Sequence, residues 1–329
     1  MNKVVLSGMR PTGKLHIGHL SVIDNWVKLQ ENYEGNFFIA DYHALTTQFD
    51  DTSELQSNIR NMMIDWLAIG LDPEKSTLFV QSQVPAHAEL YLLFSMITPL
   101  AWLERVPTYK GQVEQFREME GKDITTHGFL GYPLLQAADI LLYKAGFVPV
   151  GEDQLPHLEL TREVARRFNH LFSQKVFPEP EGLLSKIPLL MGTDGRKMSK
   201  SYNNFINIMS DEAELNGKVR SMVTDPSRIR KDDPGHPDIC PVYGYQKIYN
   251  HKESEEILAA CKGGKIGCMD CKMRLVRELN TLLCPIRDRR ASLEGRDTYI
   301  DEVIEHGRRK ASEKAQQSLR EIKEAMNLV

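Results

Sequence analysis

Hydrophobic residues in the first two thirds of the chain form short apolar runs separated by longer stretches with helical spacing. Short apolar runs predict buried strands, and apolar residues that recur every three or four positions predict helices. One such helix is expected from about Ser53, with Asp51 as its N-cap. The predicted strands are residues 4–6, 37–40, 77–80, 147–150 and 187–191, and the further helices are residues 20–29, 86–97, 133–145 and 159–168.

This alternation of strands and helices predicts an α/β fold, a Rossmann-like doubly wound parallel sheet with helices on both faces. From about Ile208 the strand signals end and helical periodicity dominates. We therefore predict a Rossmann-like domain over residues 1–205 and a C-terminal helical domain over residues 206–329. An apolar stripe near the C-terminus predicts a last helix that packs on the first domain; its residues are Ile304, Ala311, Ala315, Leu319, Ile322 and Met326.

Composition places the chain among packed soluble proteins, with 329 residues, 41% of them hydrophobic and 26% charged. No apolar run approaches the roughly 20 residues that cross a bilayer, and the N-terminus lacks the apolar segment of a signal peptide. We expect a cytoplasmic protein without membrane association. The net charge of −4 excludes a globally basic nucleic-acid-binding surface, so RNA would have to bind at local basic patches.

The turn after the first predicted strand carries the first candidate chemistry, in residues 7–19, SGMRPTGKLHIGH. A strand, a Gly/Pro-rich turn and a helix start present backbone N–H groups to a phosphate. His16 and His19 would share one helix face, and Gly18 would allow a flat ligand to approach the backbone. Imidazoles donate hydrogen bonds to phosphate, so the turn suits a phosphate that gains charge in a transition state. Taken alone, it is equally compatible with two surface histidines.

A second motif, KMSKS at residues 197–201, follows a Gly/Asp turn at residues 192–195. Its two lysines, three apart, suit a leaving pyrophosphate, although alone they would indicate an ordinary basic loop. Together, the two motifs resemble the HIGH and KMSKS signatures of class I aminoacyl-tRNA synthetases. The resemblance implies that His16, His19, Lys197 and Lys200 are the catalytic residues and act on the phosphates of ATP, which binds with Mg²⁺.

The whole chain resembles bacterial tryptophanyl-tRNA synthetases, most closely in residues 40–46, 81–89, 132–143 and 150–163. This resemblance implies activation of L-tryptophan by ATP, transfer to tRNA(Trp), anticodon binding by the helical domain, and a homodimer. Tyrosyl-tRNA synthetases, which share the fold and both signatures, are the nearest alternative; a small-molecule nucleotidyltransferase and a non-catalytic metal-containing RNA-binding protein are more distant ones. The implied ATP contacts are Arg10, Pro11, Thr12, Gly18, His19, Gly151, Glu152, Asp153, Lys197, Met198, Ser199 and Lys200.

Asp139 lies in the apolar helical segment of residues 136–142 and is expected to be buried. A buried carboxylate is costly unless it is hydrogen-bonded, although a surface or capping role is the simpler alternative. The resemblance implies that Asp139 accepts the indole N–H of tryptophan, and such a site would reject phenylalanine because the acceptor would lack a donor. The other implied amino-acid contacts are Tyr132, Gln136, Gln154 and His43, and Gln136 stands where many relatives have methionine.

All five cysteines follow residue 239, and an odd number argues against a disulfide framework. Cys240, Cys261, Cys268 and Cys271 have the spacing C-x20-C-x6-C-x2-C, which allows a four-sulfur metal site as well as four free thiols. The pattern resembles that of tryptophanyl-tRNA synthetases with a [4Fe–4S] cluster, so we expect iron–sulfur, with zinc as the alternative. Cys284 is expected to be a buried apolar residue.

Overall fold

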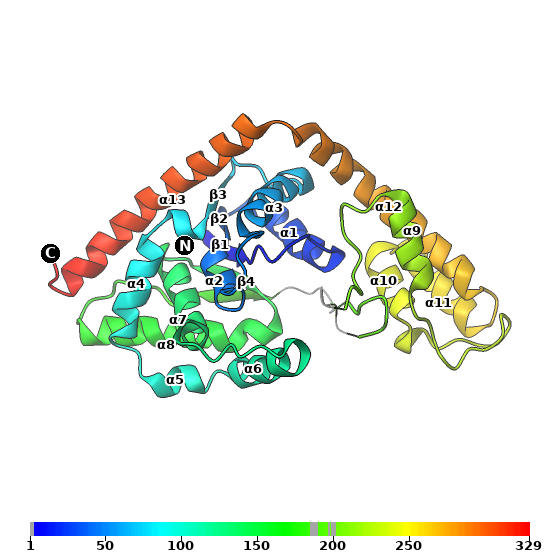
Figure 1. The fold of residues 1–329 in the computed structure, drawn as a ribbon, viewed down its shortest axis with the longest axis horizontal. Helices are drawn as coiled ribbons and strands as arrows, with labels where there is room; N and C mark the ends of the chain where they lie inside the picture. Colours follow the sequence, from blue (N-terminus) through cyan, green and yellow to red (C-terminus); the bar gives the residue numbers. More distant parts are fainter. Residues whose placement is uncertain (1–2, 185–189, 197, 199–201) are drawn as a thin grey trace. The chain divides into compact units, whose positions relative to one another are not determined.

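The computed structural model describes residues 3–184, 190–196, 198 and 202–329 (Figure 1). The chain divides into two compact units. Unit 1 comprises Met1–Gly13, Asn25–Lys186 and Gly295–Val329, and unit 2 comprises Lys14–Asp24 and Ile187–Glu294. The first helix, α1 (Ile17–Leu29), contributes residues to both units.

Unit 1 is built on a five-stranded parallel sheet with the strand order β3-β2-β1-β4-β5. This order confirms the predicted Rossmann-like, doubly wound α/β fold, in which ligands bind beyond the carboxyl ends of the strands where the order reverses. That reversal lies between β1 and β4. The strands are β1 (Val4–Met9), β2 (Glu34–Ile39), β3 (Ser76–Val80), β4 (Phe147–Val150) and β5 (Glu181–Leu184).

Helices of unit 1 cover the sheet and share its core. The buried aromatic residues Phe79, Phe94, Phe168 and Phe177 belong to one hydrophobic cluster that also includes residues of the C-terminal helix. Burial of such side chains stabilises the fold by about 25 cal/mol per Å² of apolar surface. The helices are α2 (Asp41–Leu45), α3 (Leu55–Ile69), α4 (Ala86–Ser95), α5 (Leu100–Glu104), α6 (Pro107–Glu120), α7 (His127–Leu142), α8 (Leu155–Leu171) and α13 (Asp297–Ala325), with single 3₁₀ turns η1 (Gln81–Gln83) and η2 (Glu152–Gln154).

Three element boundaries differ from the sequence-based predictions. Helix α7 begins six residues before Pro133, so this proline lies inside the helix and not at its first position; Thr126 caps the helix by accepting from Phe129 N at 3.1 Å. Asp51 does not cap α3, because its Oδ1 accepts from Ser53 N and Oγ in the turn before that helix. The predicted strand at residues 187–191 lies mostly outside the described residues, and β5 is a strand that the hydrophobic pattern did not predict.

Helix α13 packs against β3, the strand at one edge of the sheet (Figure 1). The contact is so close that a Cβ atom on Gly307 would lie 1.6 Å from the carbonyl oxygen of Leu78. Ion pairs fix the helix along its length: Arg60 binds Asp301 at 2.5 Å, and Lys314 binds Glu34. The last helix therefore packs on the Rossmann-like unit, as its apolar stripe predicts, and covers an edge strand that would otherwise present unpaired backbone groups.

Unit 2 is mainly helical in its described part, in agreement with the prediction of a C-terminal helical region. Helix α12 packs against α9 and α10. No helix among the described residues of either unit is long and apolar enough to cross a membrane. Besides the start of α1, the elements are α9 (Glu212–Ser221), α10 (Pro241–Tyr249), α11 (Ser254–Lys262), α12 (Cys268–Leu293) and the 3₁₀ turn η3 (Pro237–Ile239).

Candidate active site

Asp139 lies on α7 in unit 1 and is buried, with 1% of its side chain exposed. Its Oδ1 accepts hydrogen bonds from Gln81 Nε2 at 2.8 Å and His87 Nδ1 at 2.6 Å, and its Oδ2 accepts from His43 Nε2 at 2.8 Å. Gln81 directly follows β3, and His43 lies in α2, the short helix after β2. The carboxylate is thus held at the carboxyl edge of the sheet, where the fold positions ligands.

The donors around Asp139 keep its carboxylate ionised. Burial alone would raise the pKa of Asp139, but the hydrogen bonds and charges of His43 and His87 outweigh burial and lower it. Tyr143 lies behind His87, with its hydroxyl 2.9 Å from His87 Nε2, and burial and the charge of Asp139 raise the pKa of this phenol well above its usual range. Tyr143 therefore keeps its proton and can donate a hydrogen bond to His87 Nε2.

Gln81 has a side-chain oxygen that is a buried acceptor without a hydrogen-bond partner among the described residues. Its Nε2 must face Asp139, since a carboxylate accepts and does not donate, so the amide orientation is fixed. Its Oε1 is then buried with no hydrogen-bond partner among the described residues. An acceptor left in this state costs about 1–3 kcal/mol unless a ligand or a water molecule supplies a donor.

His157 joins two residues that the sequence places near the amino acid. Its Nε2 lies 3.1 Å from the Tyr132 hydroxyl, its Nδ1 lies 2.9 Å from Gln154 Oε1, and Gln154 Nε2 donates to Asp153 at 2.9 Å. Because Gln154 Oε1 only accepts, Nδ1 carries the proton and Nε2 accepts from Tyr132. Burial lowers the pKa of His157 to about 4, although Asp153 opposes this effect. The ring is therefore neutral near pH 7 and orients both partners.

The remaining predicted contacts of unit 1 lie next to the point where the strand order reverses. Arg10, Pro11 and Thr12 follow β1, and Gly151 with Glu152 follows β4. A Cβ atom on Gly151 would lie 2.6 Å from Asp153 Oδ1, so this carboxylate folds back on the turn. Gln136, on α7, is half-buried one helical turn before Asp139.

His16 and His19 form a compact pair in unit 2 at the start of α1. Their rings stack with centroids 3.7 Å apart. His16 Nδ1 accepts from Gly18 N at 3.1 Å, and His19 Nδ1 accepts from His16 N at 3.1 Å. Both neutral rings therefore carry their proton on Nε2, as donors to a phosphate must. The start of a 13-residue helix adds the partial positive charge that favours an anion.

Backbone hydrogen bonds join this turn to the segment that follows the KMSKS motif. Ile17 N donates to Ile206 O at 2.9 Å, Ile208 N donates to Leu15 O at 3.2 Å, and His16 pairs with Asn207 in an antiparallel bridge. From the motif itself, Met198 Cε lies 3.9 Å from the position that a Cβ atom would take on Gly18. The two motifs, far apart in the sequence, thus meet within unit 2.

Asp194 holds the residues on either side of the KMSKS motif. It accepts from Arg196 N at 3.0 Å and from Asn204 Nδ2 at 2.8 Å, while Thr193 N donates to Asn204 O at 2.7 Å. The Asn204 amide, followed by the Arg196 backbone, lowers the pKa of Asp194 to about 2. Lys197, Ser199 and Lys200, which the sequence assigns to ATP, lie outside the described residues.

The four spaced cysteines belong to unit 2. Cys240 lies directly before α10, Cys261 lies in α11, and Cys268 and Cys271 lie at the start of α12. Arg228 Nη1 lies 3.8 Å from Cys261 Sγ and 3.9 Å from Cys268 Sγ. Burial raises the pKa of Cys271 to about 11, and the other three thiols contribute to the increase. Among the described residues, however, no group of three His, Cys, Asp or Glu side chains is arranged to hold a metal ion.

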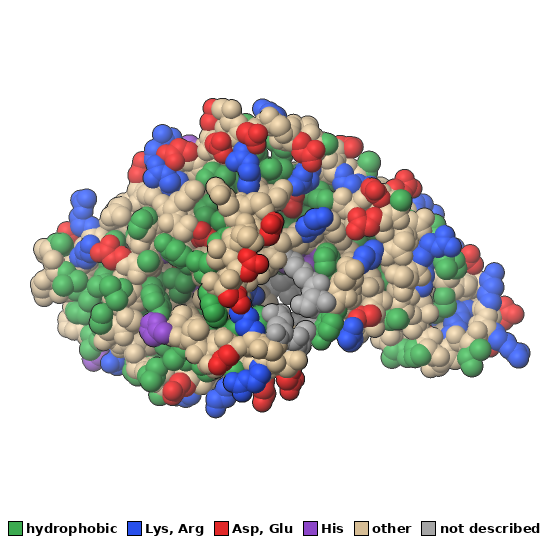
Figure 2. Space-filling view, in the orientation of Figure 1, with side chains coloured by type: hydrophobic (Ala, Val, Ile, Leu, Met, Phe, Trp, Pro, Cys, Tyr) green, Lys and Arg blue, Asp and Glu red, His purple; other side chains and the backbone are tan. Residues whose placement is uncertain are grey.

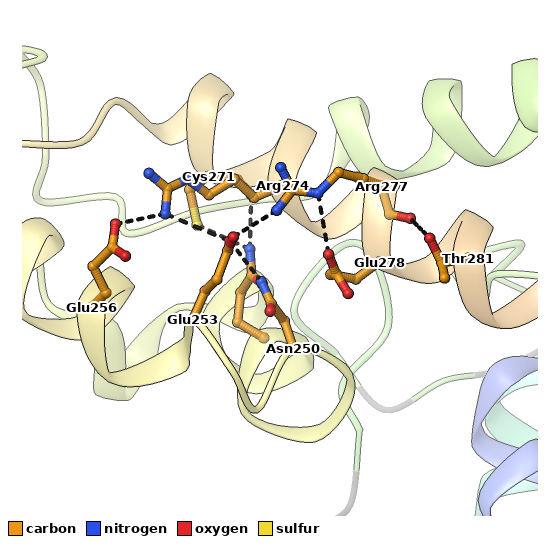
Figure 3. Close-up of polar contacts among 9 residues, drawn as sticks. Asn250, Glu253, Glu256, Cys271, Arg274, Arg277, Glu278 and Thr281 are labelled. Atoms are coloured by element: carbon orange, nitrogen blue, oxygen red, sulfur yellow. Dashed lines mark hydrogen bonds and ion pairs between the residues drawn. The ribbon is translucent and has the colours of Figure 1, made fainter.

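A hydrogen-bonded chain runs from Cys271 to surface ion pairs (Figure 3). Gln246 donates to Cys271 Sγ at 3.5 Å and accepts from Asn250 at 2.9 Å. Asn250 also contacts Glu253, which pairs with Arg277 at 2.8 Å. These contacts fix α12 to α10 and to the turn before α11. Cys284 does not belong to this group and is exposed, so the expectation that it is buried was wrong.

Surface charge shows no continuous basic face in the view of Figure 2, where Lys, Arg, Asp and Glu side chains are interspersed. This agrees with the net charge of −4. Binding of a polyanion would depend on local arrangements of positive side chains and not on an overall field.

Sequence reasoning missed Gln81, His87 and His157 as residues of the site. Gln81 and His87 lie within residues 81–89, and His157 lies within residues 150–163, stretches that were noted only for their resemblance. A polar residue directly after a buried strand was an available signal for Gln81. His87 and His157 gave no such signal, because a histidine on a half-apolar helix is most often an ordinary packing residue.

Comparison with known proteins gives a consistent result. The family "tRNA synthetases class I (W and Y)" matches residues 2–284. The chain is 53% identical to tryptophan–tRNA ligase of Thermotoga maritima, over 99% of both chains, and 48% identical to that of Aquifex aeolicus, over 98% and 99%. Its structure is similar to that of tryptophanyl-tRNA synthetase from Campylobacter jejuni complexed with ADP and tryptophan, with a TM-score of 0.86, 34% identity, and coverage of 99% and 100%.

Proposed function

The chain belongs to the class I tRNA synthetases for tryptophan and tyrosine, and we propose from this how its residues perform the reaction. It activates L-tryptophan with ATP to tryptophanyl-adenylate and transfers the tryptophanyl group to tRNA(Trp). The observation that carries our assignment of the amino-acid site is the buried, ionised carboxylate of Asp139 at the carboxyl edge of the sheet. A carboxylate there accepts the single N–H of an indole ring.

In the first step the tryptophan carboxylate attacks the α-phosphate of ATP, the bond to the β-phosphate breaks, and pyrophosphate leaves with Mg²⁺. We assign Nε2 of His16 and His19 as donors to the phosphates, and Lys197 and Lys200 as the charges that hold pyrophosphate. In the second step a ribose hydroxyl of the tRNA terminus attacks the acyl carbon, loses its proton, and AMP leaves. No covalent protein intermediate is required, so catalysis rests on positioning and electrostatics.

The remaining assignments follow the resemblance to tryptophanyl-tRNA synthetases. Tyr132 and Gln154, oriented by His157, contact the amino group of tryptophan, and His43 and Gln136 contact its side chain. Asp153, with Gly151 and Glu152, contacts the ribose of ATP. Arg10, Pro11 and Thr12 form the nucleotide-contacting turn after β1, with Gly18 and Met198 completing the ATP contacts in unit 2.

An ATP–pyrophosphate exchange assay with tryptophan, tyrosine and phenylalanine tests the assignment. We expect exchange with tryptophan at rates at least about a thousandfold above those with the other two, because a buried acceptor without its donor is costly. Faster exchange with tyrosine than with tryptophan would contradict it. Asp139→Asn, which keeps the size of the side chain, should reduce kcat/KM for tryptophan by about a hundredfold.

For the cysteines we propose a [4Fe–4S] cluster held by Cys240, Cys261, Cys268 and Cys271, with zinc as the alternative. Zinc needs four sulfurs about 2.3 Å from one centre, whereas a cluster places each cysteine on a different iron and keeps the sulfurs further apart. Arg228 lies beside two of the thiols, and Cys261 Sγ packs so closely on Gly235 that a Cβ atom there would lie 2.6 Å from it. The positive charge of Arg228 suits an anionic group. When bound, it would supply a rigid, charged support for unit 2.

Metal analysis with an absorbance spectrum of anaerobically purified protein decides between the two metals. Broad visible absorbance with about four irons per chain is the expected result for a [4Fe–4S] cluster, whereas stoichiometric zinc supports the alternative. Cys271→Ser should abolish metal binding, and Cys284→Ser, the matched control at an exposed cysteine, should leave it unchanged.

We further propose a homodimer that binds tRNA(Trp) through the helical region of residues 206–329. Support for a protein contact comes from unit 1, where Leu92, Met96 and Leu100 are exposed by 53%, 71% and 58%. Several exposed large apolar side chains in one segment of the chain are typical of an interface. Met96→Glu should convert a dimer to a monomer in analytical ultracentrifugation, whereas Glu104→Gln on the same surface segment should not.

A further inference from the structure

We infer that His87 is a positioning residue which, with Gln81, saturates Oδ1 of Asp139 and thereby makes Oδ2 the oxygen that accepts the indole N–H. The inference rests on the proposed function, since it concerns how the tryptophan site is held. It assigns a role in specificity to a side chain that would not touch the substrate.

The first step of the argument is a count of acceptor positions. An ionised carboxylate has about two acceptor positions on each oxygen. Oδ1 of Asp139 receives Gln81 Nε2 at 2.8 Å and His87 Nδ1 at 2.6 Å, so its capacity is filled. Oδ2 receives His43 Nε2 at 2.8 Å and retains one position. A further donor, such as an indole N–H, therefore binds at Oδ2.

The exposure of their partners also distinguishes Oδ1 from Oδ2. The side chains of His87 and Gln81, which serve Oδ1, are completely buried. The side chain of His43, which serves Oδ2, is 12% exposed. The oxygen with unused capacity is thus the one whose protein partner reaches solvent, and a ligand can approach it from that side.

The second step concerns what fixes His87. Its Nε2 lies 2.9 Å from the hydroxyl of Tyr143, the C-cap residue of α7, one helical turn after Asp139. The Asp139 carboxylate only accepts, so the imidazole carries a proton on Nδ1, and the Tyr143 hydroxyl can donate to Nε2. The ring packs among Phe38, Phe79 and Tyr143, with centroids 5.4–5.9 Å away. Tyr143 therefore supports the tautomer that faces Asp139, and the aromatic contacts fix the plane of the ring.

Kinetic comparison of tryptophan with its benzothiophene analogue, which has sulfur in place of the indole N–H, tests the role of His87. In the wild-type enzyme the analogue measures activity without the hydrogen bond to Asp139. In His87→Phe we expect KM for tryptophan in ATP–pyrophosphate exchange to rise at least about tenfold, the loss associated with a misplaced charge-assisted hydrogen bond. KM for the analogue should change less than about threefold, and kcat should be nearly unchanged for both.

Two further variants separate positioning from packing. His87→Gln can donate to Asp139 and accept from Tyr143, and it should restore most of the preference for tryptophan over the analogue. Tyr143→Phe removes only the hydroxyl that holds His87 Nε2, and it should lower that preference by about threefold or more.

The possible outcomes distinguish failure of the proposed function from failure of the inference about His87. A wild-type enzyme without tryptophan-dependent exchange would contradict the proposed function itself. If the wild-type enzyme is active but His87→Phe affects tryptophan and the analogue equally, the inference is wrong, because His87 then contributes only to packing. If His87→Phe does not fold, the Gln and Tyr143→Phe variants decide: an unchanged preference in Tyr143→Phe overturns the inference, and a lowered one supports it.

Discussion

Single buried polar residues account for most of the chemistry assigned to unit 1. Asp139 can remain charged in an apolar helix because His43, His87 and Gln81 supply the hydrogen bonds that water would otherwise provide. His157 does the reverse: it stays neutral while it orients Tyr132 and Gln154. The charge state of each residue is therefore set by its neighbours and not by its type.

The neutral state of His157 should make stability depend on pH. Its pKa is about 4 in the folded chain and about 6.5 when unfolded, so the unfolded chain binds more protons below pH 6.5. His157 therefore does not lower the free energy of unfolding above pH 6.5. As pH falls towards 4, it lowers that free energy progressively, by at most about 3 kcal/mol. His157→Gln should reduce this loss in thermal unfolding measured between pH 7 and pH 4.5.

An exposed histidine of the same helix provides the control for that measurement. His170→Gln, near the end of α8, should leave the pH dependence of the melting temperature as in the wild type. Equal slopes for wild type and His157→Gln would show that His157 does not titrate at a lowered pKa.

Asp194 makes a prediction about catalysis. The Asp194 carboxylate accepts from Arg196, just before the KMSKS motif, and from Asn204, just after it. Because these bonds hold both ends of the motif, Asp194→Ala should lower kcat for exchange about tenfold. KM for tryptophan should change little, since the residue lies in unit 2 and Asp139 in unit 1. Steady-state kinetics measure both constants. Glu212→Gln, an exposed change nearby in the chain, should change neither, and a rise in KM alone would contradict the assignment.

At the scale of elements, the parallel sheet positions the site because the segments that follow β1, β2, β3 and β4 all emerge at one edge. Hydrophobic runs predicted these four strands: β2 and β3 are buried almost throughout, and β1 and β4 each bury two apolar residues within a short apolar run. Strand β5 escaped prediction: its sequence EGLL is short, half-exposed and contains glycine. Helix α7 starts earlier than predicted because Pro133, taken as a start signal, is tolerated inside the helix.

Gly307 offers a test of the packing of α13 on β3. Alanine at this position would place Cβ 1.6 Å from Leu78 O, so the helix must move away from the strand. We expect Gly307→Ala to lower the free energy of unfolding by about 1–3 kcal/mol, the usual cost of overpacking. Gly111→Ala, in α6, meets no atom within 4 Å and should stabilise the protein slightly. Denaturant unfolding of both variants measures the difference, and equal effects would exclude a tight contact at Gly307.

At the scale of the whole molecule, the sequence predicted the fold class and the residue types of the site better than the contacts between those residues. The HIGH and KMSKS motifs predict phosphate chemistry only when they occur together, because each alone also suits an ordinary surface turn or loop. The pairing of residues 15–17 with 206–208 was not predictable, since it depends on backbone contacts between distant segments. The same holds for His87, whose importance lies in its contact with a residue 52 positions away. The domain division at residue 205 and the roles of the site residues stay predictions.

Removal of the proposed metal should affect the two units unequally. In Cys271→Ser, amide hydrogens of α12 should exchange faster, because four thiols would no longer be joined and local opening would cost less. Amides of β1 to β4 in unit 1 should keep their protection, as none of the spaced cysteines belongs to that unit. Hydrogen exchange followed by mass spectrometry measures both regions. Uniform loss of protection in both units would argue against a local role for the cysteines.

The cover that α13 provides for β3 has a consequence for synthesis of the protein. Strand β3 leaves the ribosome long before α13 has been translated, so a nascent sheet has one open side during most of elongation. An open strand can pair with a neighbouring nascent chain on the same messenger. Ribosomes that stall between the codons for the two elements would thus yield chains prone to aggregate, even though α13 packs against this strand in the finished enzyme.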